Sequence, residues 1–271
     1  MQLLDGQLVL SATDLVGYLA CDHLATLEMG RVAGLWERPH RRDDPTIELI
    51  QQKGDLHEAA YLDRLRAEGR TVVEIRKDNL KTGDALRSAA QETLTAMREG
   101  ADVIFQATFF DGRWRGHADF LFKRPDRPSP AFGAWSYDVA DTKLARAVKT
   151  GAILQLCVYA GLLAQVQGVE PEWLTVVTGD REEHRYRAED FAAYFRYIRS
   201  RFETRIVRDA ADPAGAQTYP NPVDHCRVCA WSPTCIQRRR DDDHLSIVAG
   251  LRRVDTERLN KSGITTLSAL A

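Results

Sequence analysis

The sequence contains few cysteines and methionines and has no strong excess of charge of either sign. Its 271 residues include five cysteines and three methionines, with 37 Lys and Arg residues against 39 Asp and Glu residues. An odd number of cysteines argues against a disulfide framework. The net charge of −2 does not address nucleic-acid binding, because such binding needs a local basic surface rather than a basic total.

The sequence also lacks a recognisable signal peptide and a long hydrophobic run. The first ten residues, MQLLDGQLVL, have no basic start and no small-residue cleavage site. The longest apolar run, residues 151–166, is interrupted by Gln155 and is shorter than the roughly 20 residues of a membrane span. We therefore expect a cytoplasmic protein without a membrane partner, in which reduced thiols bind metals instead of forming disulfides.

Of four cysteines that could act together, three are clustered in the sequence and one lies far from them. Cys226, Cys229 and Cys235 lie within HCRVCAWSPTC, and Cys21 stands near the N-terminus. This close spacing lets three thiolates converge on one soft metal centre, whose fourth position a distant residue must fill. We predict that Cys21 is this fourth ligand. Cys157 falls within an expected helix and is interpreted as a small buried hydrophobic residue.

The hydrophobic pattern predicts strands flanked by helices. Helices are expected over residues 11–20, 45–67, 83–97, 150–167 and 189–208. Strands are expected over residues 7–10, 71–75, 102–110, 114–122, 135–143, 174–179 and 184–187. The sequence therefore predicts an α/β or α+β protein with a mixed central sheet.

Two of the predicted strands carry charged residues that could meet. Alternation places Asp119 on one face of the first strand, and Asp141 and Lys143 share a face of the second. Burying two carboxylates is costly, and a divalent cation such as magnesium or manganese would remove that cost. The alternative is an exposed salt bridge among these three residues, since D-x-K is common by chance.

Three further residues have both a functional and a structural interpretation. Gln155 and Tyr159 are four residues apart and share one face of the helix that follows the D-x-K strand. They could serve a site, or form the polar stripe of an ordinary amphipathic helix. His57, three residues after Gly54, lies within a predicted helix, where a lone histidine is more often structural than a ligand.

In their order along the chain, these motifs resemble the RecB-type branch of the PD-(D/E)xK nucleases. The motifs are a glycine-to-histidine element ending at His57, G-x-x-D with Gly116 and Asp119, D-x-K with Asp141 and Lys143, and Q-x-x-x-Y with Gln155 and Tyr159. The one-plus-three cysteines are similar to the iron–sulfur subset of that branch. This subset includes the CRISPR-adaptation exonucleases and the AddB nuclease domain.

The resemblance implies a restriction-endonuclease-like core over residues 1–240. It implies that Cys21, Cys226, Cys229 and Cys235 bind a [4Fe-4S] cluster. It also implies that His57, Asp119 and Asp141 bind magnesium or manganese, together with the backbone carbonyl of residue 142. By the same resemblance Lys143 is the catalytic lysine, and Gln155 and Tyr159 position DNA or the lysine. Asp141 stands where this branch more usually has glutamate.

The activity implied by the resemblance is metal-dependent hydrolysis of DNA phosphodiester bonds. The expected enzyme is an exonuclease that prefers single-stranded DNA and acts in DNA repair, recombination or phage defence. Residues 241–271 contain two short helical segments around Gly263 that resemble a helix-hairpin-helix. We expect them to lead into helicase or additional nuclease domains of a longer protein.

Two charged segments have open interpretations. In RRRDDDH, we expect Arg238, Arg239 and Arg240 to pair with the aspartates three residues later on a solvated helix face. The predicted helix 189–208 carries an apolar stripe, Phe191, Tyr194, Phe195, Ile198 and Phe202, and five arginines, Arg196, Arg199, Arg201, Arg205 and Arg208. These arginines either contact DNA phosphates or form a solvated face.

Three alternatives remain open at this level. The cysteines could bind zinc, with His23 or His225 contributing mixed ligation. The chain could be a non-catalytic DNA-binding module in which the metal scaffolds a groove beside a degenerate site. It could also be an unrelated metal-stapled domain that binds protein partners.

Overall fold

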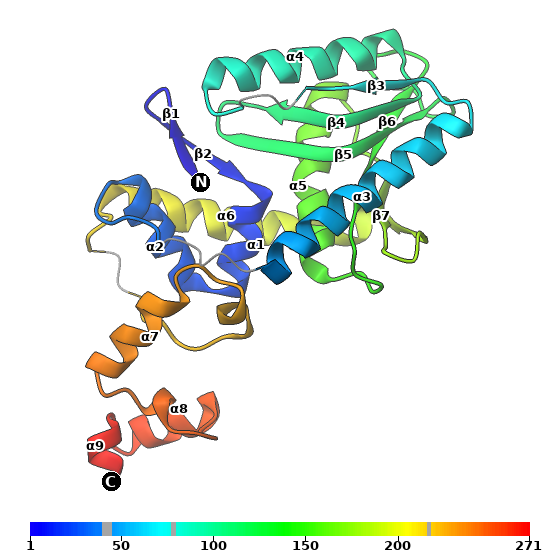
Figure 1. Ribbon diagram of the computed structural model, residues 1–271. Helices are drawn as coiled ribbons and strands as arrows, with labels where there is room; N and C mark the ends of the chain where they lie inside the picture. Colours follow the sequence, from blue (N-terminus) through cyan, green and yellow to red (C-terminus); the bar gives the residue numbers. More distant parts are fainter. Residues whose placement is uncertain (40–44, 77–79, 216–217) are drawn as a thin grey trace. The chain divides into compact units, whose positions relative to one another are not determined.

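The structure is a computed structural model that describes residues 1–39, 45–76, 80–215 and 218–271. The chain divides into two compact units (Figure 1). We call Met1–Val16 with Asp43–Phe202 the sheet unit, and Gly17–Arg42 with Glu203–Ala271 the cysteine unit. The division into residues 1–240 and 241–271 stays a prediction.

The sheet unit contains a mixed sheet of eight strands within the described residues. They are β1 (Gln2–Leu4), β2 (Gln7–Ser11), β3 (Val72–Glu74), β4 (Val103–Phe110), β5 (Trp114–Arg124), β6 (Ser136–Thr142), β7 (Trp173–Val177) and β8 (Glu183–Arg187). Their order is β1-β2-β5-β6-β7-β8, and β4 pairs with both β3 and β5. The β4–β5, β5–β6 and β7–β8 pairs are antiparallel, whereas β2–β5, β3–β4 and β6–β7 are parallel.

Helices cover both faces of this sheet, so the predicted mixed α/β class is confirmed. The helices are α3 (Pro45–Ala67), α4 (Gly83–Glu99) and α5 (Thr150–Gln167). On one face, Tyr61 of α3 packs edge-on against Phe120 of β5, with ring centroids 5.1 Å apart. On the other face, the hydroxyl of Tyr137 donates to the carbonyl of Ala101 just after α4, at 2.8 Å, and its backbone N–H donates to Gln167 of α5.

Helix α5 is long and apolar enough to cross a membrane by length and composition alone, but most of it is buried in the protein. Ile153, Leu156 and Leu163 are each at most 5% exposed. Cys157 is also buried, as predicted. The core of the sheet unit therefore accounts for the apolar composition of α5.

The cysteine unit is helical within the described residues. It contains α2 (Asp22–Val32), η1 (Asp224–Arg227), α7 (Ser232–Asp241), η2 (Leu245–Ile247), α8 (Arg253–Lys261) and α9 (Leu267–Leu270). Helices α1 (Ala12–Ala20) and α6 (Glu189–Ala211) each have residues in both units. Gly263, at φ +83°, lies between α8 and α9, at the expected place of the hairpin.

Buried polar contacts join the two chain segments that make up the cysteine unit. Trp231 is 2% exposed, and its indole Nε1 donates to Glu28 at 2.8 Å. Arg205 donates to Asp22 at 2.7 Å and to Asp209 at 2.6 Å. The Trp231–Glu28 and Arg205–Asp22 contacts each link a residue before position 42 to one after position 203. The contact with Asp209 holds Arg205 in place for this link. The unit is therefore assembled from two chain segments that are far apart in the sequence.

Two of the three predicted pairs within RRRDDDH, Arg238 with Asp241 and Arg239 with Asp242, are wrong. Arg238 pairs with Asp242, four residues on, at 2.7 Å, because one helical turn brings positions i and i+4 together. Arg239 is buried and donates to the carbonyl of Pro220 at 2.8 Å. Arg239 is therefore part of the packing of the cysteine unit rather than of a solvated face.

Candidate functional site

The strand register brings the two predicted carboxylates to adjacent positions. β5 and β6 pair antiparallel with Phe120 opposite Ala140. Continuing this register by one residue places Asp119 opposite Asp141. Side chains directly opposite each other lie about 5 Å apart at their β carbons, so the carboxylates lie close together where the β5–β6 ladder ends.

Asp119 is held by the residue that follows Asp141. Its Oδ2 accepts a hydrogen bond from the backbone N–H of Thr142 at 2.8 Å and another from the Thr142 hydroxyl at 2.9 Å. Two donors on one oxygen fix the rotamer of the carboxylate. The D-x-K element thus orients Asp119 as well as supplying Asp141.

Asp141 is 1% exposed and lies among three polar groups. Its Oδ1 accepts from Gln155 at 3.2 Å, and its Oδ2 forms an ion pair with Lys143 without a well-aligned hydrogen bond. The pKa of Asp141 is raised to about 8, mainly because the carboxyl is buried and secondarily because Asp119 is negatively charged. The ammonium of Lys143 acts in the opposite direction.

Tyr159 completes this group and explains a glycine of the sequence motif. Its hydroxyl accepts from Gln155 Nε2 at 2.8 Å, and burial raises its pKa, so the phenol stays neutral. A β carbon on Gly116 would lie 2.8 Å from Cδ1 of the Tyr159 ring. Glycine is therefore required at position 116 for the close approach of α5 to β5.

His57 approaches β7 from α3, and among the described residues neither carboxylate forms a hydrogen bond or ion pair with it. Its Nε2 lies 3.4 Å from the carbonyl oxygen of Val177, which also accepts from the backbone N–H of Lys143 at 2.8 Å. The structure thus brings together Asp119, Asp141, Lys143, Gln155 and Tyr159. His57 lies beside the last residue of β7, one backbone carbonyl away from the lysine. Gly54 has room for a β carbon, whose nearest neighbour would be Leu144 at 3.9 Å, so close packing does not require glycine there.

Sequence reasoning missed Gln106, the residue of β4 opposite Asp119. Phe105 pairs with Phe120 and Ala107 with Ala118, and between them Gln106 has a left-handed φ of +59°. This is uncommon for a residue other than glycine and often marks a functional site. Its amide Nε2 donates to Glu58, the neighbour of His57 on α3.

The side chains of β5 do not alternate strictly between the two faces of the sheet on either side of Asp119. Phe120 packs on α3, whereas Gly116, which alternation places on the same face, lies against Tyr159 and Leu162 of α5. The break in alternation lies next to Asp119, which is opposite the left-handed Gln106 of β4.

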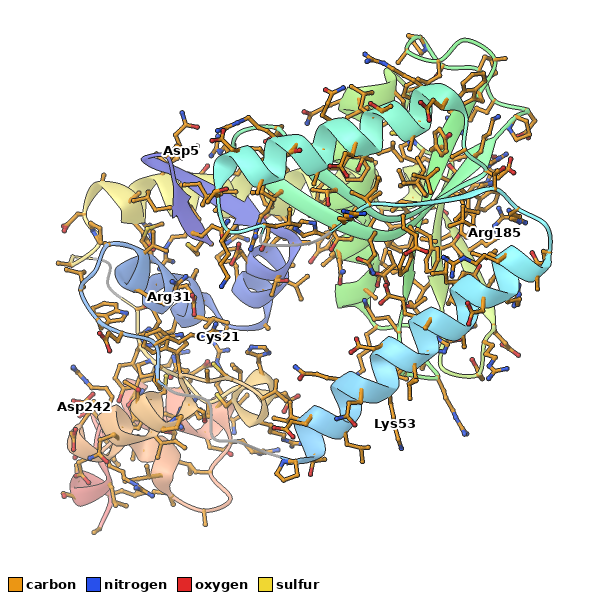
Figure 2. The ribbon with its side chains drawn as sticks, turned by 45° about the horizontal axis from the view of Figure 1, so that its top comes forward. Asp5, Cys21, Arg31, Lys53, Arg185 and Asp242 are labelled. Carbon is orange, nitrogen blue, oxygen red and sulfur yellow. The ribbon has the colours of Figure 1, made fainter. Side chains whose placement is uncertain are left out.

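The four predicted cysteine ligands line one cavity of the cysteine unit. Cys21 lies between α1 and α2 (Figure 2), and the other three lie on η1, after it, and on α7. Both histidines considered as zinc ligands, His23 and His225, line the same cavity. His23 Nδ1 is engaged with the Thr218 hydroxyl at 2.7 Å.

Three thiols of this cavity, those of Cys21, Cys229 and Cys235, have raised pKa values. Burial, reinforced by the neighbouring thiols, raises the pKa of Cys235 to about 11. Burial likewise raises the pKa values of Cys21 and Cys229, against the lowering effect of backbone hydrogen bonds. Metal ligation requires thiolates and would therefore release protons from this cavity.

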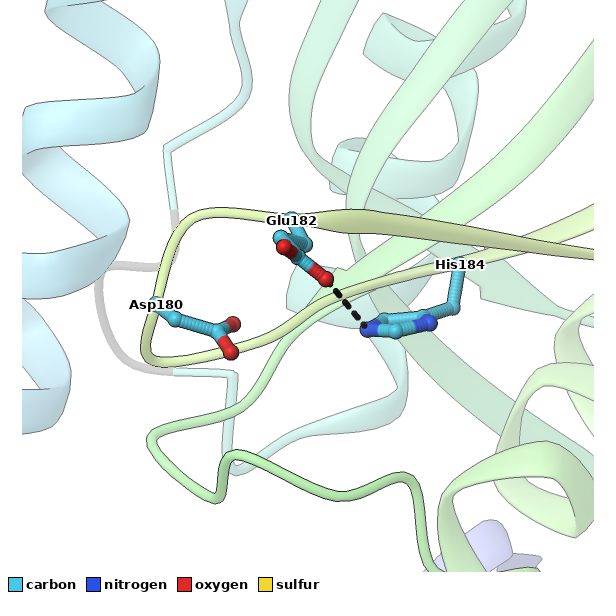
Figure 3. A group of neighbouring side chains, drawn as sticks. All are labelled: Asp180, Glu182 and His184. Atoms are coloured by element: carbon cyan, nitrogen blue, oxygen red, sulfur yellow. Dashed lines mark ion pairs between the residues drawn. The ribbon is translucent and has the colours of Figure 1, made fainter.

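A third group of possible ligands, not predicted from the sequence, lies in the β7–β8 turn. Asp180, Glu182 and His184 place one ligand atom each within 4.8 Å of the others, with Glu182 and His184 3.9 Å apart (Figure 3). Both carboxylates are exposed. Thr178 donates to Asp180 at 2.6 Å and contacts His184 at 3.1 Å. Local turn bonding accounts for this arrangement.

The arginines of α6 do not form one phosphate-facing row. Arg205 is enclosed by Asp22, Asp209 and Thr26, so it fits neither of the two interpretations, a contact with DNA phosphates or a solvated face. Arg199 lies over the ring of buried Trp114, 5.0 Å from its centroid. Of the predicted apolar stripe, Phe195, Ile198 and Phe202 are buried, but Tyr194 is 50% exposed.

Comparison with known proteins leaves the family of this chain unassigned. No family model and no curated protein matches it. Among solved structures it is similar to one described as "Crystal structure of SSO0001", with 15% sequence identity and a TM-score of 0.28. That match covers 82% of this chain and 93% of the other. At this identity and TM-score the match assigns neither activity nor ligand.

Proposed function

We propose that the sheet unit is a metal-dependent DNA nuclease and that the cysteine unit carries an iron–sulfur cluster. The observation that carries the proposal is the buried Asp141, placed beside Asp119 and enclosed by Lys143, Gln155 and Tyr159. The order of the motifs, which resembles RecB-like PD-(D/E)xK nucleases, supports a restriction-endonuclease-like core. It also supports single-stranded DNA as the substrate and exonucleolytic cleavage.

The donor set fits magnesium or manganese. Two adjacent carboxylates raise each other's cost of ionisation, and Oδ2 of Asp141 has no well-aligned hydrogen-bond donor within the described residues. Asp119 and Asp141 would hold the ion, with His57 reaching it after leaving the Val177 carbonyl. A divalent ion at this position supplies positive charge against the phosphate and acidifies water.

The residues of the chain have separable roles in this hydrolysis. An oxygen of water forms a bond to phosphorus and that water gives up a proton to the solvent. The bond from phosphorus to a sugar oxygen breaks, and the departing oxygen takes up a proton from the solvent. Lys143 holds an ammonium beside Asp141, where it orients the attacking water and offsets negative charge on the phosphate. Gln155 orients Asp141 through Oδ1 and is itself held by the buried Tyr159.

The arrangement of the thiols supports a cluster over a single zinc ion. Four thiolates around tetrahedral zinc, at Zn–S distances of about 2.3 Å, would lie about 3.8 Å apart. Among the described residues, the one group of three or more such ligand atoms within 4.8 Å of each other is the β7–β8 group. The four cysteines line one cavity, but among the described residues no three of their sulfur atoms form such a group, which favours a larger inorganic group ligated by four cysteines.

Cleavage assays on anaerobically purified protein test the nuclease proposal. End-labelled single-stranded and duplex DNA are incubated with magnesium or manganese and, separately, with a chelator. We expect Asp119→Asn and Asp141→Asn to lower the cleavage rate by about 10³-fold or more, since each removes a charge that the ion requires. Asp180→Asn, an exposed acid of the same unit, is the matched control and should cut normally.

Cleavage by either variant at the wild-type rate would overturn the nuclease proposal. Metal-independent DNA binding without any cleavage would instead favour the non-catalytic DNA-binding module.

A further inference from the structure

Thr142 occupies the variable position of the D-x-K element, yet it makes two of the shortest contacts at the candidate site. Its backbone N–H and its hydroxyl both donate to Oδ2 of Asp119, at 2.8 and 2.9 Å. The side chain is 9% exposed, so water competes weakly for these hydrogen bonds. Thr142 therefore holds the Asp119 carboxylate in one orientation.

This arrangement makes the two oxygens of Asp119 unequal. Oδ2 carries two hydrogen bonds from Thr142, whereas Oδ1 receives none from it. A carboxylate oxygen that already accepts two hydrogen bonds has few lone pairs left for a cation. Asp119 is thereby prepared to ligate through one oxygen.

One-oxygen ligation distinguishes among divalent cations. Calcium accepts carboxylates through one or both oxygens in flexible coordination shells of six to eight ligands. Magnesium requires near-octahedral geometry and is bound through few carboxylate oxygens. Manganese suits the same carboxylate and water ligands.

We propose that Thr142 is a positioning residue that commits Asp119 to one-oxygen ligation and so favours manganese and magnesium over calcium. The inference rests on the proposed function, because it concerns the metal of that site. Outer contacts that orient a metal ligand commonly change metal affinity by about 10- to 100-fold when removed. The hydroxyl is one of two such contacts here, so we expect a change near the lower end.

The test compares Thr142→Val with Thr142→Ser by titration calorimetry of the full chain with Mn²⁺, Mg²⁺ and Ca²⁺, without DNA. Valine keeps the shape of threonine but removes the hydroxyl, whereas serine keeps the hydroxyl. We expect Thr142→Val to raise the Kd for Mn²⁺ by about tenfold and the Kd for Ca²⁺ by less, with Thr142→Ser close to wild type. Thr175→Val, in the neighbouring strand β7 and also buried, controls for the general effect of the substitution.

Several results would overturn the inference. The hydroxyl has no such role if Thr142→Val binds Mn²⁺ as tightly as wild type, or if serine fails to restore binding. An equal loss of affinity for Mn²⁺ and Ca²⁺ would refute the selectivity. Failure of the proposed function is recognised separately, because wild type and Asp119→Asn would then bind Mn²⁺ equally poorly.

Discussion

The two units keep ionisable side chains close together by different means. In the sheet unit, Asp141 is buried, but Lys143 and Gln155 provide a counter-charge and a hydrogen bond. In the cysteine unit, burial raises the pKa values of Cys21, Cys229 and Cys235, so these thiols are neutral near pH 7. We infer that the carboxylate site is arranged by the fold itself. Burial also raises the pKa of Asp141, to about 8, so a metal would replace protons in either unit. The difference is that the sheet unit already holds an ammonium against its buried acid.

The largest expected effect comes from removing one thiol of the cysteine unit. Cys226→Ser should abolish iron and sulfide binding and destabilise this unit by several kcal/mol, because ligation joins distant chain segments. Iron and acid-labile sulfide are measured in anaerobic protein. Limited proteolysis should show faster cleavage within 17–39 and after residue 218, whereas fragments of the sheet unit persist.

Cys157→Ser is the matched control, since this buried thiol lies on α5 outside the cavity. It should retain iron and sulfide. Stoichiometric zinc without iron in the wild type would contradict the cluster and favour the zinc alternative.

The second prediction uses the pH dependence of stability to test whether Asp141 carries a cost in the metal-free sheet unit. Its pKa is raised to about 8 in the folded state, against about 3.9 for an unfolded aspartate. Folding therefore favours the protonated acid, and this contribution is lost as pH rises from about 4 to about 8. The expected slope is at most about 1.4 kcal/mol per pH unit.

Asp141→Asn should remove that slope. In a chelator, the free energy of unfolding of the variant relative to wild type should rise from pH 5 to pH 8 and then level off. Lys143, whose side chain is 35% exposed, can be hydrated after losing its partner. Adding Mn²⁺ should stabilise wild type and leave the variant unchanged. If the free energies of unfolding of the two proteins depended on pH in the same way, the predicted cost of ionising the buried Asp141 would be refuted.

The smallest expected effect concerns two glycines of the sequence motifs. Gly116→Ala should destabilise the sheet unit by about 1–3 kcal/mol, because its β carbon would press on the ring of Tyr159. Gly54→Ala, where space is open, should stabilise α3 by up to about 1 kcal/mol. Urea unfolding measures both changes. Equal effects of the two substitutions would contradict the close approach at Gly116.

Periodicity predicted most regular elements because the local pattern determines which face of each element is buried. Helix α5 occupies the predicted residues 150–167, and α3 the predicted 45–67. Strand β1 and helix α2 were not predicted. β1 has three residues, and α2 buries Glu28 beside Trp231, a partner that is distant in sequence.

The candidate site was predictable in its residue types but not in its details. Alternation identified Asp119, Asp141 and Lys143 because each charge interrupts an apolar strand. The roles of Thr142 and Gln106 depend on cross-strand register and a left-handed backbone, which no local pattern encodes. The position of His57 beside Val177 depends on how α3 lies on the sheet, and this too is a tertiary property.

The interrupted chain path of the cysteine unit has a consequence for biosynthesis. Cys21 leaves the ribosome early, whereas Cys226, Cys229 and Cys235 follow only after the whole sheet unit has been made. The sheet unit can fold while synthesis continues, but the N-terminal thiol must wait, exposed to oxidants and to competing metals. On the proposed function, loading of the cavity with its cluster is therefore a late event. Cells that translate slowly or are short of iron should accumulate a form with a completed sheet and an empty thiol cavity.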